Sequence, residues 1–275
     1  MSTIVITGAS DGIGAAAARI LRGGDGRLIL VGRSPEKTAA VAAEVGAEYF
    51  VADFAHLDQV RALADDLLAA ADRIDVLANN AGGMFSGPVR TEDGFERTFQ
   101  INVLAPVLLT NLLCERLVAS RAAVVNTASI AARLFGRLDL DDIQTWDAFT
   151  PNRAYGNAKL GNILFTRGLH EHFRARGITT VAFHPGNVAT SFASDTTSYL
   201  RWLYHTALRR FLLISPERGG ANLAHFIQGR PGVDWISGEY YDDHYRPGRT
   251  AREGRDLEVV RQYWDRLAEL LDLSW

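Results

Sequence analysis

Short apolar runs alternate with longer amphipathic stretches along most of the chain. Five runs rich in Val, Ile and Leu are bounded by Gly, Asn or Asp, which is typical of strands buried on both faces of a parallel sheet. They are Thr3–Thr7, Arg27–Val31, Ile74–Ala78, Ala123–Thr127 and Ile178–Phe183, and helical patterns lie between them at Pro35–Val45, Leu57–Ala70 and Arg153–Arg176. Ser34 is the expected N-cap of the first helix. The alternation predicts an α/β fold: one doubly wound Rossmann domain with a parallel sheet and helices on both faces.

Two stretches interrupt this alternation. Arg133–Pro151 is polar and reads as an insertion, whereas residues from about 190 to 215 are apolar and aromatic, with arginines interspersed. Long excursions on an open α/β sheet are usually functional, so the second stretch is expected to be a substrate lid, with membrane-surface contact as the alternative. Since no linker or repeat divides the sequence, residues 1–275 are expected to form a single dinucleotide-binding catalytic domain.

Composition narrows the function classes. The chain has 275 residues, 47% of them hydrophobic, which is enough for one large packed domain. Its single cysteine, Cys114, excludes an internal disulfide and any multi-cysteine metal site, and no metal is expected. A net charge of −3 does not favour a nucleic-acid partner. With no apolar run near the roughly 20 residues of a membrane span and no visible signal peptide, we expect a cytoplasmic protein.

A glycine-rich turn follows the first apolar run. It reads Thr7-Gly8-Ala9-Ser10-Asp11-Gly12-Ile13-Gly14 and leads into an alanine-rich helix. Glycines allow the backbone to approach a pyrophosphate, whose charge the helix N-terminus favours. The turn therefore predicts a dinucleotide site, and its Gly-x-x-x-Gly-x-Gly spacing resembles that of the short-chain dehydrogenase/reductase family.

Further motifs carry the same resemblance over about two thirds of the chain. They are Asn79-Asn80-Ala81-Gly82, Asn102, Ser129, the Tyr-x-x-x-Lys pair Tyr155 and Lys159, and His184-Pro185-Gly186 with Thr190. Three features are similar to the retinol dehydrogenase-like and carbonyl reductase branch of this family. They are the sequence Tyr155-Gly156-Asn157-Ala158-Lys159-Leu160-Gly161-Asn162, the long interval between Ser129 and Tyr155, and the segment Ser215–Gly220. The resemblance implies that Asn102, Ser129, Tyr155 and Lys159 are catalytic.

The chemistry of the Tyr-x-x-x-Lys pair follows from its spacing. Side chains four residues apart lie on one face of a helix. A phenol is a poor acid or base at neutral pH, and a nearby ammonium lowers its pKa. Tyr155 is thus expected to exchange a proton with a carbonyl oxygen that Ser129 holds by a hydrogen bond. The family resemblance implies that Asn102 retains a water linking Lys159 to solvent.

The preferred dinucleotide is expected to be NADP(H), with NAD(H) possible. The second strand ends at Arg33-Ser34 without an acidic residue, and Arg33 can clamp a 2′-phosphate bidentately, although Asp11 opposes this mildly. Together with the family resemblance, which implies the roles outside the glycine-rich turn and the end of the second strand, these patterns give the expected cofactor-binding residues: Gly8, Ser10, Asp11, Gly12, Ile13, Gly14, Arg33, Ser34, Asp53, Phe54, Asn80, Ala81, Gly82, Tyr155, Lys159, Pro185, Gly186, Val188 and Thr190.

The sequence thus predicts an oxidoreductase that transfers a hydride between NADP(H) and a carbonyl or alcohol. Apolar residues flank the motifs, so the substrate is expected to be an apolar ketone or aldehyde, cyclic or polyketide-like, contacted by Met84, Phe85, Leu134, Phe135, Phe192 and Trp202. Two alternatives stay open: a non-catalytic dinucleotide sensor, and a carbon–carbon double-bond reductase, dehydratase or epimerase on the same scaffold. The protein is expected to be a monomer or homodimer, since the insertion lies where it can block the dimer face of relatives.

Overall fold

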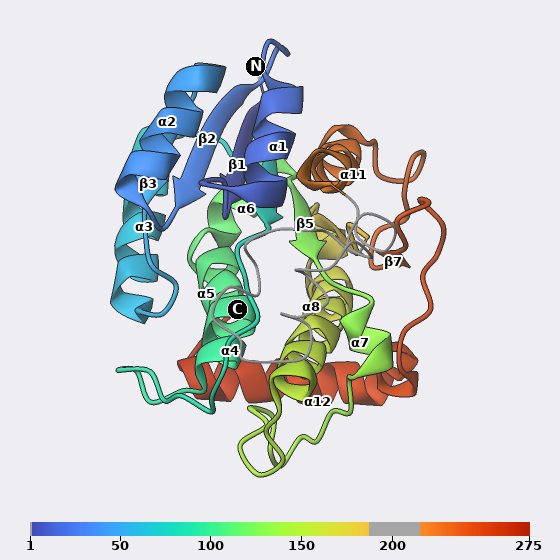
Figure 1. Ribbon diagram of the computed structural model, residues 1–275. Helices are drawn as coiled ribbons and strands as arrows, with labels where there is room; N and C mark the ends of the chain where they lie inside the picture. Colours follow the sequence, from blue (N-terminus) through green and yellow to red (C-terminus); the bar gives the residue numbers. More distant parts are fainter. Residues whose placement is uncertain (1, 187–214) are drawn as a thin grey trace.

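Seven parallel strands form one sheet in the order β3-β2-β1-β4-β5-β6-β7 in the residues that the computed structural model describes, which are 2–186 and 215–275 (Figure 1). The strands are β1 Thr3–Thr7, β2 Arg27–Gly32, β3 Glu48–Val51, β4 Val76–Asn79, β5 Ala123–Thr127, β6 Thr179–Phe183 and β7 Tyr240–Tyr241. The chain order reverses between β1 and β4, and ligands of open α/β sheets bind beyond the carboxyl ends of the strands at such a point. The predicted doubly wound fold is confirmed.

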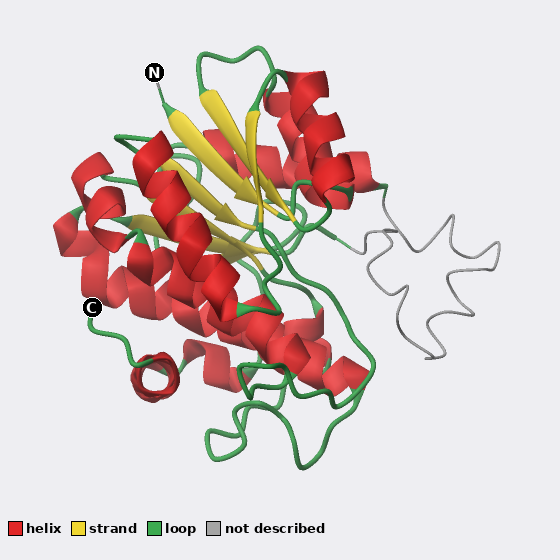
Figure 2. Cartoon of the chain, turned by 90° about the vertical axis from the view of Figure 1, so that its left-hand side faces the viewer, coloured by secondary structure: helices red, strands yellow, loops and turns green. Residues whose placement is uncertain are grey.

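Helices cover both faces of the sheet (Figure 2). One face carries α1 Gly12–Leu21, α2 Pro35–Val45 and α11 Pro216–Gln228, and the other carries α3 Leu57–Ala70, α5 Ala105–Leu112, α6 Cys114–Ser120 and α8 Pro151–Phe173. Shorter elements are α4 Arg97–Phe99, a π-helical turn at Gln100–Leu104, α7 Ala131–Leu134 and 3-10 turns at Arg174–Arg176 and Arg252–Arg255. Each face has its own apolar core, so the sheet is buried on both sides, as its continuous apolar strands require.

Most predicted boundaries agree with the structure, and the differences have local causes. The α2 and α3 bounds are as expected, and Ser34 caps α2 by accepting a hydrogen bond from the backbone N–H of Lys37. The long helix α8 begins two residues earlier than predicted because Thr150 caps it through the N–H of Arg153. Strand β4 begins at Val76, later than predicted. Ile74 is buried, but its N–H donates to Ser120 Oγ instead of joining the sheet.

The side chain of Asn157, on α8, ties the insertion to that helix. Asn157 accepts a hydrogen bond from the Arg137 N–H at 2.7 Å and donates to Thr145 Oγ1 at 2.8 Å. Within the insertion, the Asp142 carboxylate accepts hydrogen bonds from two consecutive backbone N–H groups. The insertion therefore has a defined position beside α8. The predicted lid at about 190–215 lies almost entirely outside the described residues.

A C-terminal helix, α12 Leu257–Leu271, runs across the outer face of α8 (Figure 1, red). The packing depends on glycines of α8: a Cβ at Gly161 would lie 2.1 Å from Tyr263 Oη, and one at Gly168 would lie 2.5 Å from the Trp264 ring. The ring of Trp275 lies against that of Trp264, with centroids 4.3 Å apart and planes tilted by 36°. The outer surface of α8 is consequently covered by the chain itself.

Among the described residues no single helix is long and apolar enough to cross a membrane, although the bent pair Arg97–Leu112 and Cys114–Ser120 meets both conditions when taken together.

Candidate active site

The glycine-rich turn between β1 and α1 forms a cradle with no room for a side chain at Gly8 or Gly14. A Cβ at Gly14 would lie 2.3 Å from the Gly8 carbonyl oxygen, and one at Gly8, whose φ is +67°, would lie 2.7 Å from Ala81 Cα. Asp11 caps α1 by accepting from the Gly12 N–H at 2.7 Å. A close backbone approach at a helix N-terminus is what a pyrophosphate requires, so this turn fits a dinucleotide.

The loop after β4 is tied to the ends of its neighbouring strands. Thr7 Oγ1 accepts from the N–H groups of Asn80 and Ala81, both at 3.0 Å, and Asn80 Nδ2 donates back to the Thr7 carbonyl. Thr127 Oγ1 donates to Asn80 Oδ1 at 3.3 Å. Asn79, expected in this loop, is instead the last residue of β4. These contacts place Asn80, Ala81 and Gly82 beside the glycine-rich turn.

The end of β2 brings together more charge than the sequence indicated. Arg33 is exposed after Gly32, where a Cβ would lie 2.8 Å from Ser10 Cβ, so the glycine-rich turn lies directly beside this strand end. Lys37, which was not among the predicted residues, reaches the same place from the first turn of α2 and lies 3.4 Å from Asp11. Its only sequence signal is its position four residues after Arg33. Two cations thus flank the cradle, one of them paired with Asp11.

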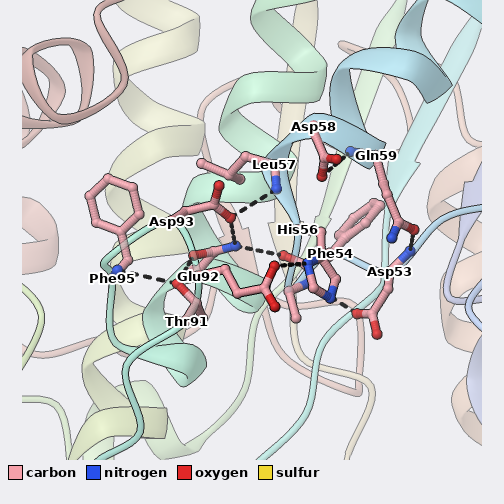
Figure 3. A network of polar contacts seen from close by, with 12 residues as sticks. Asp53, Phe54, His56, Leu57, Asp58, Gln59, Thr91, Glu92, Asp93 and Phe95 are labelled. Atoms are coloured by element: carbon pink, nitrogen blue, oxygen red, sulfur yellow. Dashed lines mark hydrogen bonds and ion pairs between the residues drawn. The ribbon is translucent and has the colours of Figure 1, made fainter.

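The residues after β3 place a hydrogen-bond acceptor next to a hydrogen-bond donor. Asp53 is half-buried and its Oδ1 accepts from the Ala55 N–H, while its own N–H donates to Gln59 Oε1 (Figure 3). Within the described residues, the backbone N–H of Phe54 has no hydrogen-bond partner. A carboxylate next to an unpaired N–H complements an adenine edge, which pairs an amino donor with a ring-nitrogen acceptor.

Tyr155 and Lys159 lie side by side on α8. The Lys159 ammonium is 5.6 Å from the centre of the Tyr155 ring and donates to the Thr127 carbonyl oxygen at 2.9 Å. Lys159 is almost completely buried, and this burial lowers its pKa to about 7. The positive charge is therefore expensive here unless a ligand or anion supports it.

Ser129 reaches the same region from the turn between β5 and α7. Its Oγ accepts from the Ala131 N–H at 3.2 Å, which leaves the hydroxyl hydrogen available to another acceptor. Helix α7 packs very closely on α8: a Cβ at Gly156 would lie 2.8 Å from the Phe135 carbonyl carbon and 2.9 Å from the Ala131 oxygen. This contact sets how Ser129 stands relative to Tyr155.

Asn102 lies in the π-helical turn Gln100–Leu104 and is completely buried. Its side chain accepts from the Gly83 N–H and donates to the carbonyl oxygens of Gly83 and Thr98. Gly82 separates it from Lys159, since a Cβ there would lie 2.4 Å from Asn102 Oδ1 and 3.2 Å from Lys159 Nζ. The amide of Asn102 therefore holds the loop after β4. The sequence showed Asn102 but not the π-turn.

The turn after β6 is held from two sides. The Gly186 N–H donates to His184 Nδ1 at 3.1 Å, and Asn222 of α11 donates to the Pro185 carbonyl oxygen at 3.1 Å. His184 is buried, which lowers its pKa, and Asp243 faces its other nitrogen at 3.7 Å. The predicted residues Val188, Thr190, Phe192 and Trp202 lie outside the described residues.

The predicted substrate residues fall into two environments. Met84 is buried against Ala131 and Tyr155, whereas Leu134 and Phe135 of the α7 region are exposed, at 51% and 39% of their surface. Phe85 is covered by Arg97, whose guanidinium lies 4.8 Å from its ring. Met84 thus borders Tyr155, and Phe135 lies against Gly156, the next residue of α8. Phe85 packs against Arg97 instead.

Known proteins resemble this chain over nearly its whole length. The family model described as short chain dehydrogenase matches residues 2–200. A Streptomyces protein assigned as a daunorubicin C-13 ketoreductase is 37% identical, covering 96% of this chain and 90% of that protein. Human retinol dehydrogenase 13 is 33% identical, covering 99% of this chain and 85% of its own.

Two solved structures extend the comparison. An uncharacterised protein of Mycobacterium paratuberculosis has a TM-score of 0.79 at 28% identity, covering 100% of this chain and 94% of that one. A metagenomic short-chain oxidoreductase in complex with NADP has a TM-score of 0.60 at 27% identity, covering 83% of this chain and 91% of that one.

Proposed function

Because the chain belongs to the short-chain dehydrogenase/reductase family, in its retinol dehydrogenase-like branch, and is thus an oxidoreductase of alcohols and carbonyl compounds, we propose that it is an NADPH-dependent reductase of apolar ring ketones or aldehydes. The observation that carries this proposal is the buried Lys159 ammonium beside the Tyr155 ring. Ser129, on the turn before α7, keeps a hydroxyl hydrogen available for a substrate oxygen. A sensor has no use for this acid–base pair.

The chain's own groups would handle the substrate's oxygen and the proton. When bound, the nicotinamide supplies the hydride for reduction or accepts it in the reverse direction. The Ser129 hydroxyl donates a hydrogen bond to the carbonyl oxygen, and the Tyr155 phenol delivers its proton to that oxygen. The Lys159 charge favours the phenolate that remains. In alcohol oxidation, Tyr155 takes the proton back.

NADP(H) is proposed over NAD(H) because two cations stand at the end of β2. Arg33 and Lys37 together would accommodate a 2′-phosphate, and Asp11 draws Lys37 toward the cradle at 3.4 Å. The metagenomic structural neighbour bound to NADP supports the same choice. Asp53 and Phe54 would hold the adenine.

The substrate class is proposed from the apolar surface around Tyr155. Met84 and Ala131 border the phenol, and Leu134 and Phe135 are exposed apolar residues that follow Ala131 in the chain. A flat apolar ring system would bury them, and the ketoreductase relative is named for a daunorubicin substrate. We propose one catalytic domain over residues 1–275 in a cytoplasmic protein. We also propose that the protein is a monomer, because α12 already covers α8.

The test is oxidation of NADPH and of NADH, followed by absorbance, with a panel of polycyclic ketones, quinones and aldehydes. Tyr155→Phe should abolish turnover while cofactor binding persists, and Tyr49→Phe, on the exposed edge strand β3, should leave it unchanged. Binding of NADPH without reduction of any carbonyl would favour the sensor. Saturated carbon–carbon products with the carbonyl intact would favour the double-bond reductase.

A further inference from the structure

Gln100 is a completely buried amide that uses every polar group it has. It opens the π-helical turn that carries Asn102, two residues further on. Its Nε2 donates to Asp93 Oδ2 at 2.7 Å and to the Phe54 carbonyl oxygen at 3.3 Å. Its Oε1 accepts from the Thr91 hydroxyl. A buried amide satisfied on all sides has one orientation, because any other would leave polar groups unpaired.

The turn Thr91–Phe95 is the frame that orients this amide. Thr91 closes the turn by accepting from the Phe95 N–H with its side chain and donating its own N–H to the Phe95 carbonyl. Asp93 projects from the turn and also accepts from the Leu57 N–H at 3.0 Å, at the first residue of α3 (Figure 3). One carboxylate oxygen thus joins α3 to Gln100.

The segment between β3 and α3 is consequently fixed on both sides of Phe54. Gln59 holds the Asp53 N–H, Gln100 holds the Phe54 carbonyl, and Asp93 holds the Leu57 N–H. The Phe54 N–H between these anchors has no partner among the described residues. Pre-organised donors bind more tightly than mobile ones because less ordering entropy is lost on binding.

We propose that Gln100, oriented by Asp93, is a positioning residue that sets the affinity for the adenosine half of the dinucleotide by holding the Asp53–Phe54 segment. The inference rests on the proposed function, since it concerns the same nucleotide site. It adds a residue outside the predicted set that acts through Phe54 without touching the ligand.

The first experiment measures fragment binding and needs no turnover. Titration calorimetry with adenosine 5′-monophosphate and with adenosine 2′,5′-bisphosphate, which differ only in the 2′-phosphate, compares wild type, Gln100→Met and Ser120→Ala. Met keeps the length of the side chain and removes its hydrogen bonds, while Ser120→Ala removes one buried hydrogen bond, to the Ile74 N–H, elsewhere in the fold. Gln100→Met should weaken both fragments about tenfold, since a hydrogen bond contributes about 0.5–1.5 kcal/mol. The Ser120 variant should bind as wild type does.

The second experiment separates positioning from general destabilisation. In Gln100→Met the KM for NADPH should rise about tenfold, while kcat and the KM for the carbonyl substrate stay within twofold. Asp93→Asn should shift the KM in the same direction by a smaller factor, and it carries the test if Gln100→Met does not fold.

The outcomes are distinct from those of the proposed function. Unchanged fragment affinity in folded Gln100→Met, or an equal loss in Ser120→Ala, would overturn the positioning role even if the enzyme reduces ketones. Equal wild-type affinity for the two fragments would count against the NADP preference, while a loss of both in Gln100→Met would still support the role of Gln100.

Discussion

Lys159 donates its ammonium hydrogen to the carbonyl oxygen of Thr127, the last residue of β5, at 2.9 Å. The same oxygen accepts from Asn162 Nδ2 at 3.2 Å. If a bound ribose draws the ammonium away, Asn162 still satisfies the strand-end carbonyl. The buried lysine can therefore change partners without leaving an unpaired group behind.

Burial of Lys159 predicts a pH-dependent stability in the ligand-free protein. Its pKa is about 7 when folded, against an ordinary 10.5, so the unfolded chain binds the extra proton between these values. The unfolding free energy should then rise with pH by up to about 1.4 kcal/mol per unit in this window. Urea unfolding at pH 7.5 and 9 would show this gain in wild type relative to Lys159→Met.

The comparison with Lys159→Met removes the contributions that both proteins share. Burial raises the pKa of Cys114 to about 11, which lowers stability as pH rises above about 9 in either protein. Identical slopes for the two proteins would mean that Lys159 titrates normally.

Arg33 and Lys37 should determine the choice of cofactor. Arg33→Ala and Lys37→Ala are each expected to raise the KM for NADPH by about 10- to 100-fold, the value of a charged hydrogen bond, and to leave the KM for NADH nearly unchanged. Steady-state kinetics with both cofactors measure this, with Arg61→Ala on the exposed side of α3 as the control. Equal losses with both cofactors would argue against a 2′-phosphate site.

The close contact of α7 with α8 should make Gly156 indispensable for turnover. In Gly156→Val the side chain would meet the backbone of Phe135 and Ala131, so α7 and Ser129 must move away from Tyr155. A displacement of about 1 Å can cost about 100-fold in kcat. We expect this loss with little change in cofactor affinity. Gly24→Ala, where the added carbon meets only the Leu21 oxygen at 3.4 Å, is the control.

The covering of α8 by α12 predicts a monomer whose stability depends on Trp264. Its ring lies against Gly168 and stacks with Phe165 at 5.8 Å. Trp264→Ala should cost about 3–5 kcal/mol of unfolding free energy and loosen α12. Light scattering should find wild type monomeric and the variant prone to self-association. A stable wild-type dimer would contradict the prediction.

The sequence pattern predicted the bounds of an element correctly where residues close together in the sequence determine its structure. The strands β1 and β5 and the helices α2 and α3 have their predicted bounds, because buried apolar runs and N-caps are local signals. Strand β3 was not delimited, since its Glu48, Tyr49 and Val51 are exposed at the sheet edge and carry no apolar run. The two residues of β7 are too few for any pattern.

The sequence by itself determined the α/β fold, the glycine-rich turn and the pair Tyr155 and Lys159, because each depends on spacing within one strand, turn or helix. Only the tertiary structure decided which distant groups meet. It brought Lys37 to Asp11, Gln100 to the Phe54 carbonyl and α12 onto α8, and it buried Lys159 enough to lower its pKa to about 7. Desolvation and hydrogen bonds between distant segments depend on what packs around a residue, and a linear pattern does not contain that.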